Sequence, residues 1–578
     1  MRPLHQCLLD TDLVRLQAIA RLWGVELTTN RQRDVAIQLA EAMTRPEAVA
    51  DALDVLAGDQ RRALEALLAA EGRMPLRVFT RQWGEIRTMG PGRLEREQPW
   101  QAPVSSAEGL WYSGFISRAF EQGAEGSYEA VFVPPELRAF LPTPPIPPSS
   151  IVLEPAPEPT AVRAAGDTFL DDACTLLAYL QNERVHSSPD GGWPTYHEAR
   201  LTQRLHDADP TRLALLRHLV QHLGWLRVTD AGHLRPTPGP VATWLQSSTD
   251  QQRSALAEAW RDDPAWNDLF HVPTLHPEET GAWRNDPVLA RKAILRHLKA
   301  CVPNTWYRLD DLVAAVKQAN PDFQRPDGDY TSWYIRNAAT GTYLSGFESW
   351  DAVEGALICY VIAGPLAWLG LIDLGADAPG EPPAAFRLSQ AGAAFLGLAG
   401  PLPEPEPVPM ILRSDFTVLA PAARRYDRFQ LARVVDWMRT GDPFVYRITP
   451  TGLERARQQG IPVARVLEFL GQVTGAPVPR FVETALTRCE AHGAEARIER
   501  VVLLRLSSKE LMALVTSSPL TRRLIHEQVG ATVALVRERD WPRLVVALGE
   551  MGLLPEVIGL EEESGKRSDA PLKRGAPG

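Results

Sequence analysis

The sequence predicts a mainly helical α+β protein in which several similar helical modules precede a small α/β domain. Two patterns support this class. Between residues 59 and 400, groups of helices with apolar stripes are followed by short alternating stretches typical of a β-ribbon, and in residues 410–558 strands and helices alternate. The chain of 578 residues is too long for a single core, and its hydrophobic content of 45% allows several cores to form.

Two proline-rich passages divide the chain. "LPTPPIPPSSIVLEPAPEPT" from Leu141 and "PLPEPEPVP" from Pro401 should form extended linkers and no helix or sheet, because proline lacks an N–H donor and fixes φ. Beyond Gly559 there is little to bury, so we expect disorder. The predicted organisation is a helical SAP-like segment at 1–58, winged-helix-like modules at 59–140, 168–261 and 286–400, a linker at 141–167, a connecting segment at 262–285, a spacer at 401–409, an α/β domain at 410–558 and a tail at 559–578.

Residues 1–58 contain two short helices around an extended loop. Leu13, Leu16, Ile19 and Trp23 recur at helical spacing, and Gly24 then supplies a helix stop. The arrangement resembles a SAP-like DNA-binding motif. A helical hairpin that only packs on a neighbouring module fits the same pattern, so both interpretations stay open.

The modules between 59 and 400 share one order of elements. In 168–261, "TFLDDACTLLAYLQNERV", "RLTQRLHDA" and the start of "TRLALLRHLVQHLGWLRVTDAGHLRPTP" predict three helices, and the end of the last stretch predicts a two-stranded ribbon. Three helices followed by a ribbon is the winged-helix order, in which one helix can enter a DNA groove. The sequence therefore predicts tandem winged-helix-like modules with DNA as a partner.

The usual motifs of enzymes do not occur in the sequence. We find no GxxxxGK[ST] phosphate loop and no HExxH, GxSxG or GxGxxG element. The five cysteines are scattered without CxxC pairs, which predicts buried free thiols and neither a zinc module nor disulfide bonds. We therefore expect no enzymatic activity, no catalytic residue, no cofactor and no small-molecule substrate.

The strongest metal candidate is "HLVQH", where His218 and His222 stand at the spacing that shares a helix face. No glutamate lies between them and no third ligand is obvious. A solvated helix face beside the apolar stripe of Leu215, Leu219 and Leu223 is the preferred interpretation. We therefore predict no metal site.

The formal net charge of −10 argues against a protein that coats nucleic acid through bulk charge. Positive charge is nevertheless concentrated in residues 410–558, where 21 Lys and Arg residues exceed 16 Asp and Glu residues. The N-terminus lacks the pattern of a secretory signal, and the most apolar run, at 355–375, is broken by Gly364-Pro365. We expect a cytoplasmic protein without a membrane partner.

Residues 410–558 predict a small sheet covered by helices. "MILRSDFTVLAP" and "DPFVYRIT" have strand patterns, and "ARRYDRFQLARVVDWMRTG" between them, at 423–441, has a helix pattern. Pro450 and Gly460 bound one short helix, and Pro462 and Gly471 bound the next. No residue in the two short helices carries a catalytic pattern.

This order of signals resembles the N-terminal region of the XPB helicase family, its damage-recognition-like domain. The resemblance is carried by "ILRSDFTVLAP" and by "YRITPTGLERARQQGIPVARVLEFLGQVTGAPVPRFVETALTRCEAHG". It implies association with DNA or with repair and transcription machinery, and a helicase or nuclease as a partner protein. The whole chain also resembles stand-alone bacterial helicase-associated proteins without motor lobes, so helicase activity is not implied.

Two functions remain in view. The first is a non-enzymatic DNA-binding or helicase-associated accessory protein in DNA repair or transcription, which docks on duplex or forked DNA or recruits a helicase. The alternative is a protein-interaction scaffold without direct DNA contact. For the first function, the predicted phosphate contacts come from Arg31, Arg33, Arg81, Arg87, Arg93, Arg424, Arg425 and Arg428. For each arginine, a solvated helix face is the plainer interpretation.

Overall fold

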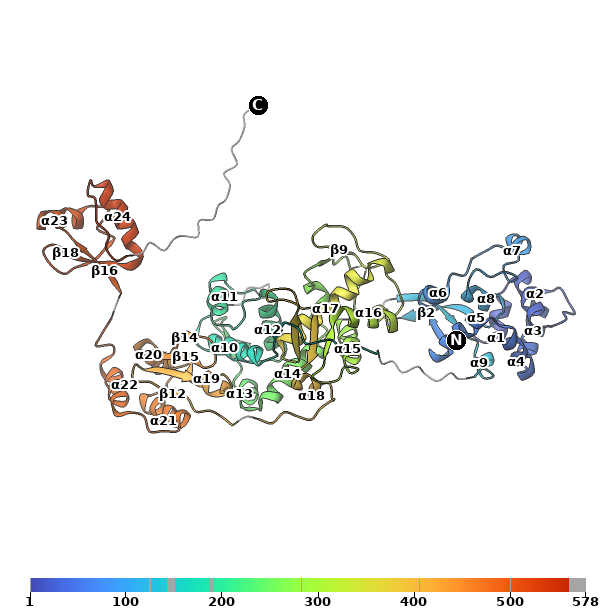
Figure 1. Cartoon of the computed structure of the whole chain (residues 1–578), viewed down its shortest axis with the longest axis horizontal. Coiled ribbons are helices and arrows are strands. Elements are labelled where there is room, and N and C mark those ends of the chain that lie inside the picture. The colour runs from blue at the N-terminus through green and yellow to red at the C-terminus, as the bar shows by residue number, and fades with distance from the viewer. Residues whose placement is uncertain are drawn as a thin grey trace, which may run out of the picture. The chain divides into compact units, whose positions relative to one another are not determined.

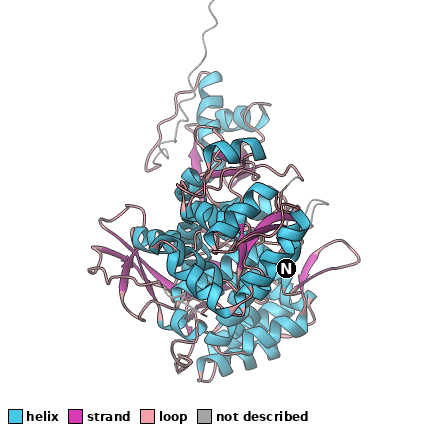
Figure 2. Cartoon of the chain, turned by 90° about the vertical axis from the view of Figure 1, so that its right-hand side faces the viewer, coloured by secondary structure: helices cyan, strands magenta, loops and turns pink. Residues whose placement is uncertain are grey.

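The computed structural model describes residues 2–123, 126–142, 151–186, 192–281, 283–404, 406–498 and 500–560 (Figure 1). The chain divides into two compact units, Met1–Leu486 and Thr487–Gly578, so the division falls inside the segment predicted as one domain at 410–558. Helices predominate over small antiparallel sheets in the described residues (Figure 2), which confirms the mainly helical α+β class. Of the predicted tail, residues 561–578 lie outside the described residues.

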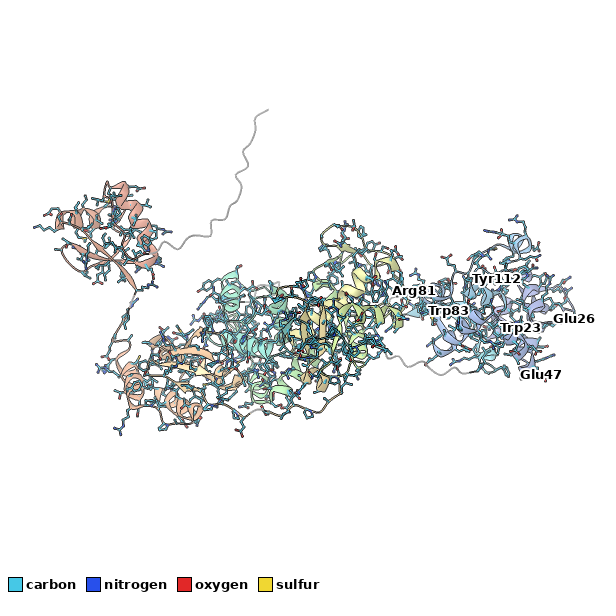
Figure 3. All side chains as sticks on the ribbon, in the orientation of Figure 1. Trp23, Glu26, Glu47, Arg81, Trp83 and Tyr112 are labelled. Carbon is cyan, nitrogen blue, oxygen red and sulfur yellow. The ribbon has the colours of Figure 1, made fainter. Side chains whose placement is uncertain are left out.

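The N-terminal part of the first unit packs helices around a three-stranded sheet of order β1-β3-β2. Its elements are α1 (Leu4–Leu9), α2 (Leu13–Leu22), α3 (Gln32–Met43), α4 (Pro46–Val55), α5 (Gly58–Ala69), β1 (Arg73–Pro75), α6 (Leu76–Trp83), α7 (Pro91–Glu97), α8 (Ser106–Tyr112), β2 (Ser117–Gly123), β3 (Gly126–Phe132) and α9 (Pro135–Arg138). Trp23 and Tyr112 are buried here, and the indole N–H of Trp23 donates to the Ser113 carbonyl at 2.7 Å (Figure 3).

The described residues of the proline-rich passage from Ile151 onward pack on the modules that follow them. Ala156 donates its N–H to the Trp306 carbonyl at 2.7 Å, and β4 (Ala161–Arg163) pairs with β10 (Ile372–Ala376). The proline-rich passage itself ends at Thr160, before this strand; β4 occupies residues 161–163 of the predicted linker at 141–167. The prolines end at Pro159, and the residues of β4 carry N–H donors. Residues 143–150 of the predicted linker lie outside the described residues.

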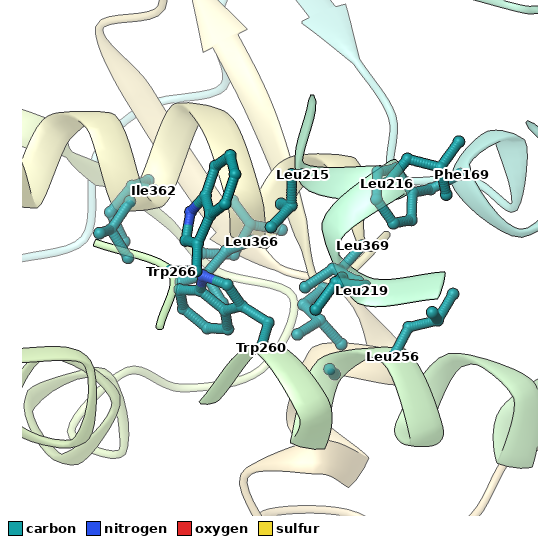
Figure 4. Packing of buried hydrophobic residues seen from close by; sticks show 14 of the residues in the cluster. Phe169, Leu215, Leu216, Leu219, Leu256, Trp260, Trp266, Ile362, Leu366 and Leu369 are labelled. Carbon is teal, nitrogen blue, oxygen red and sulfur yellow. The ribbon is translucent and has the colours of Figure 1, made fainter. Parts of the chain in front are cut away.

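The largest apolar cluster among the described residues lies mainly within 168–400 and takes side chains from helices far apart in the chain. Figure 4 shows Leu219, Leu256 and Leu366 together in this cluster. The elements are α10 (Thr168–Asn182), α11 (Thr195–Thr202), α12 (Pro210–His222), β5 (Leu226–Val228), β6 (Leu234–Pro236), α13 (Pro238–Gln246), α14 (Thr249–Asp262), η1 (Asp268–His271), β7 (Leu275–Pro277), α15 (Pro287–Leu298), β8 (Trp306–Arg308), α16 (Leu309–Ala319), β9 (Ile335–Asn337), η2 (Phe347–Ser349), η3 (Asp351–Gly355), α17 (Ala356–Val361), η4 (Ile362–Leu366), β10, β11 (Ala385–Leu388) and α18 (Gln390–Phe395).

The order α10, α11, α12 and then the β5-β6 hairpin is the order that the sequence pattern predicts for this module. The winged-helix assignment itself stays a prediction. None of the described helices combines the length and apolar composition needed to cross a bilayer.

The first unit ends in a four-stranded sheet of order β12-β13-β15-β14 with helices packed on it. Its elements are β12 (Ile411–Leu412), β13 (Thr417–Ala420), α19 (Arg425–Leu431), β14 (Val435–Arg439), β15 (Phe444–Ile448), α20 (Pro450–Gln458) and α21 (Val463–Thr474). Helix α22 (Arg480–His492) contains the division between the two units after Leu486. The single helix predicted at 423–441 is wrong, because α19 stops at Leu431 and β14 follows. The backbone of β14 pairs with β15 in the sheet. The local helix pattern does not reveal this partner.

The second unit, considered by itself, is a three-stranded sheet of order β16-β18-β17 with two helices. Val515, Val536, Leu544 and Leu548 form its small core. Its elements are β16 (Val501–Arg505), α23 (Lys509–Ser517), β17 (Ile525–Gln528), β18 (Val533–Arg537), η5 (Glu538–Asp540) and α24 (Trp541–Glu550).

Candidate functional site

Two of the eight predicted phosphate-binding arginines are exposed, and their guanidinium groups have no ion-pair or hydrogen-bond partner among the described residues. Arg31 precedes α3 and Arg33 lies in its first turn. Within the part of the chain that the structure describes, neither guanidinium forms an ion pair or a hydrogen bond. Both therefore remain available for a phosphate.

Three predicted arginines of the first modules are held by carboxylates. Arg81 forms an ion pair with Asp322. Arg87 binds Glu108 with two guanidinium nitrogens, at 2.8 and 2.7 Å. On the exposed face of α7, the Nε of Arg93 donates to a carboxylate oxygen one turn later, in Glu97, at 2.7 Å. A phosphate would have to compete with these carboxylates.

Arg425 and Arg428 lie in the interior, each 1% exposed. Both donate to the same carboxylate oxygen of Asp171 at 2.9 Å, and Arg425 also lies 3.2 Å from a carboxylate oxygen of Asp167. The third predicted arginine of this region, Arg424, is partly exposed and pairs with its own helix neighbour Asp427. Burial is incompatible with a phosphate contact, so we correct the prediction for Arg425 and Arg428. They join α19 to α10.

The α10–α19 junction borders a hollow of about 450 Å³, which we call the Arg204 pocket. Helices α10 and α11 supply one wall, and β14, β15 and α20 supply the other. The charged residues of its lining are Glu183, Arg200, Arg204, Arg428, Asp436 and Arg455.

Among the described residues, Arg204 is the cation of this pocket that has no ion-pair partner. Its half-buried guanidinium lies 5.0 Å from the ring centre of Tyr179 and 5.6 Å from that of Trp437. Within the described residues, no carboxylate or carbonyl accepts a hydrogen bond from it. Burial, and then the positive charge of Arg200, lower the pKa of Arg204 below its ordinary value. A bound anion would therefore stabilise the charged form of this guanidinium.

The other arginines of the pocket have partners. Arg200 lies 3.3 Å from a carboxylate oxygen of Glu183. Arg455 lies 3.1 Å from a carboxylate oxygen of Asp436, and it also donates to the Val435 carbonyl at 2.6 Å. These pairs leave Arg204 as the group whose charge a bound ligand would neutralise.

A second hollow, of about 490 Å³, lies between α19 and α21. Phe469 and Tyr426 contribute apolar surface to it, and Arg433 donates from Nε to the side-chain oxygen of Gln459 at 2.8 Å. Arg465 is exposed, with no ion pair in the described part of the chain. The lining also holds Asp427 and Glu468, against Arg424, Arg433 and Arg465. This excess of basic over acidic side chains beside apolar surface is suited to a protein segment that carries acidic residues.

Cys174, which lines the Arg204 pocket, and Cys301, which lies in the core, are poor nucleophiles. Burial raises the pKa of the Cys301 thiol to about 12 and raises that of Cys174. Thiols with raised pKa values stay protonated at neutral pH, and the thiolate is the reactive form. The chemistry offered by the Arg204 pocket is therefore electrostatic binding and aromatic contact.

The family comparison concerns the same part of the chain. Residues 410–529 match the family described as Helicase conserved C-terminal domain. The match links the chain to helicase-associated proteins in general. The search of curated proteins returned no match to this chain. The resemblance to the XPB N-terminal region stays a prediction.

Sequence reasoning did not find Arg204 or Trp437. Arg204 is one more polar residue in the predicted short helix "RLTQRLHDA", and Trp437 lies in the wrongly predicted helix at 423–441. The alternation of "VVDWMR" was the available signal for a strand. Nothing local indicated that the two side chains meet, because the contact joins the turn after α11 to β14, which lie far apart in the chain.

Proposed function

We propose that the protein is a non-enzymatic, helicase-associated accessory factor that contacts DNA. The observation that carries the proposal is the match of residues 410–529 to the helicase conserved C-terminal domain. The absence of a phosphate-loop motif from the sequence supports an accessory role over a motor. DNA repair and transcription are the processes in which we place it.

The Arg204 pocket supports the DNA contact. A DNA phosphate would neutralise a guanidinium that has no acidic partner among the described residues, and the nearby Trp437 ring offers a surface on which a base can stack. Arg31 and Arg33 provide a second site of exposed positive charge, at the start of α3. A chain with a net charge of −10 needs such local sites, because its overall field repels DNA.

The proposal is tested by fluorescence anisotropy of labelled duplex and forked DNA with the full-length protein. Binding at low salt should weaken in an Arg31→Ala, Arg33→Ala double variant. Arg93→Ala is the matched control, since Arg93 is already paired with Glu97 and its loss should change affinity little. Failure to bind either DNA at low salt would overturn the DNA contact.

The second candidate is a protein-interaction scaffold without DNA contact. The α19–α21 hollow favours it, because Phe469 and Arg465 together suit an acidic, partly apolar peptide. In this case the protein would bind a helicase or nuclease, and Arg465→Glu would weaken that complex by charge reversal. DNA binding that persists without any partner protein would argue for the first candidate.

A further inference from the structure

A cluster of potential metal ligands lies away from the Arg204 pocket. His218 and His222 stand one turn apart on α12, and Asp263 follows the last turn of α14. The structure brings Asp263 to the two histidines across 45 residues of sequence from His218. This supplies the third ligand that the sequence pattern did not show.

The three side chains point their ligand atoms toward one another. The Nε2 of His218 forms a hydrogen bond with one carboxylate oxygen of Asp263, and the Nδ1 of His222 lies 3.5 Å from the other. The three ligand atoms all lie within 4.8 Å of one another. Ligands at zinc bond lengths of about 2.0–2.2 Å are separated by roughly 3–3.5 Å, so modest side-chain rotations would admit an ion.

The Asp263 carboxylate is buried and lacks an arginine or lysine partner among the described residues. Its side chain is 1% exposed, and the Ala265 N–H donates to it at 2.8 Å. The buried Arg291 binds the main-chain carbonyl of Asp263 at 2.7 Å and leaves the carboxylate to the histidines. A buried carboxylate without a full cationic partner is costly, which favours a bound cation.

The surroundings fix the position of the cluster. Trp266, which is part of the core in Figure 4, packs against the His218 ring with centroids 5.3 Å apart. The indole N–H of Trp266 is in turn held by Asp268 at 3.2 Å. The side chains of His218 and His222 are 29% and 41% exposed, so the fourth position of a tetrahedral ion would face solvent.

We propose that His218, His222 and Asp263 bind one divalent cation of the zinc type. Two imidazoles and one carboxylate suit zinc and neighbouring transition metals and do not suit Ca²⁺ or Mg²⁺, which take oxygen ligands. The ion would replace the hydrogen bond between His218 and Asp263 and tie the end of α14 to α12. Its role is to stabilise this helical module, since a ligand that binds only the folded chain stabilises it.

The test uses full-length protein freed of metal with a chelator and titrated with zinc sulfate by calorimetry. We expect one zinc ion per chain, a rise in the unfolding temperature on binding, and a tetrahedral ligand-field spectrum with cobalt(II). His222→Asn should weaken zinc binding by at least about tenfold, because even loss of an outer-shell partner costs tenfold or more. His276→Asn is the control, because His276 is exposed and lies outside the cluster.

Asp263→Asn removes the buried ligand, but it also changes the hydrogen bond to His218. The exposed His222 therefore provides the safer variant, with circular dichroism to verify the fold and His222→Gln as a second replacement. Equal zinc affinity in the wild type and a folded His222 variant would overturn the proposal. Equal losses in His222→Asn and His276→Asn would overturn it as well.

Discussion

The Nε of Arg425 lies 2.9 Å from the Oδ1 of Asp171, although 254 residues separate them in the chain. This buried pair joins the start of residues 410–529, the segment that matches the helicase family, to the helical module before it. Arg428 shares the same carboxylate oxygen. The two arginines, proposed from the sequence as DNA contacts, instead hold together the walls of the Arg204 pocket.

Asp171→Asn should destabilise the first unit. The change leaves Arg425 and Arg428 buried without their shared anion, and breaking a buried ion pair costs about 3–5 kcal/mol. Denaturant unfolding of the full chain, followed by tryptophan fluorescence, measures the loss. Glu454→Gln is the control, since Glu454 pairs with Arg457 on an exposed face and little change is expected there. Similar stability of both variants would contradict the structural role.

Glu108 should make the stability of the N-terminal module depend on pH. Burial alone would raise the pKa of Glu108, but the Arg87 guanidinium and two backbone N–H groups lower it below its ordinary value. Because the folded pKa is depressed, the stabilisation is complete above the ordinary value of about 4.3. It is lost as the pH falls through the folded pKa.

Glu108→Gln tests this dependence. The free energy of unfolding of the variant should be about 1–3 kcal/mol lower at pH 7, because a charged hydrogen-bond network is removed from a buried site. The difference in stability between wild type and variant should narrow below a pH of about 4.3. Thermal unfolding of both proteins between neutral and acidic pH measures the gap. A constant gap over that range would exclude this role of Glu108.

Gly452 allows α20 to approach the chain beside β14. A Cβ added at Gly452 would overlap the main-chain carbonyl of Val434. Gly452→Ala should therefore destabilise the sheet module by about 1–3 kcal/mol, the usual cost of overpacking. Gly471→Ala in α21 is the matched control: the nearest atom to its added Cβ is 3.8 Å away, and alanine favours the helix. Denaturant unfolding of both variants compares them, and an equally tolerated Gly452→Ala would refute the close approach.

The sequence predicted the elements whose signals are local. Pro450 and Gly460 mark α20, and the apolar spacing after Pro462 marks the start of α21. The predicted end of α21 at Gly471 is wrong, because the helix continues to Thr474 and Gly475 caps it. Strand β14 was missed because its pairing with β15 depends on a distant partner. The same limit applies to charge, since no local pattern shows that Arg425 is neutralised by Asp171 while Arg204 is left unpaired among the described residues.

The most direct test of the proposed DNA contact compares wild type with Arg204→Ala by anisotropy of forked DNA over a series of salt concentrations. Loss of one phosphate contact should lower affinity and reduce the log-log salt slope by about 1. Arg204→Lys should keep most of the slope, and Arg93→Ala should match the wild type. An unchanged slope in Arg204→Ala, or no DNA binding by the wild type at low salt, would contradict the account.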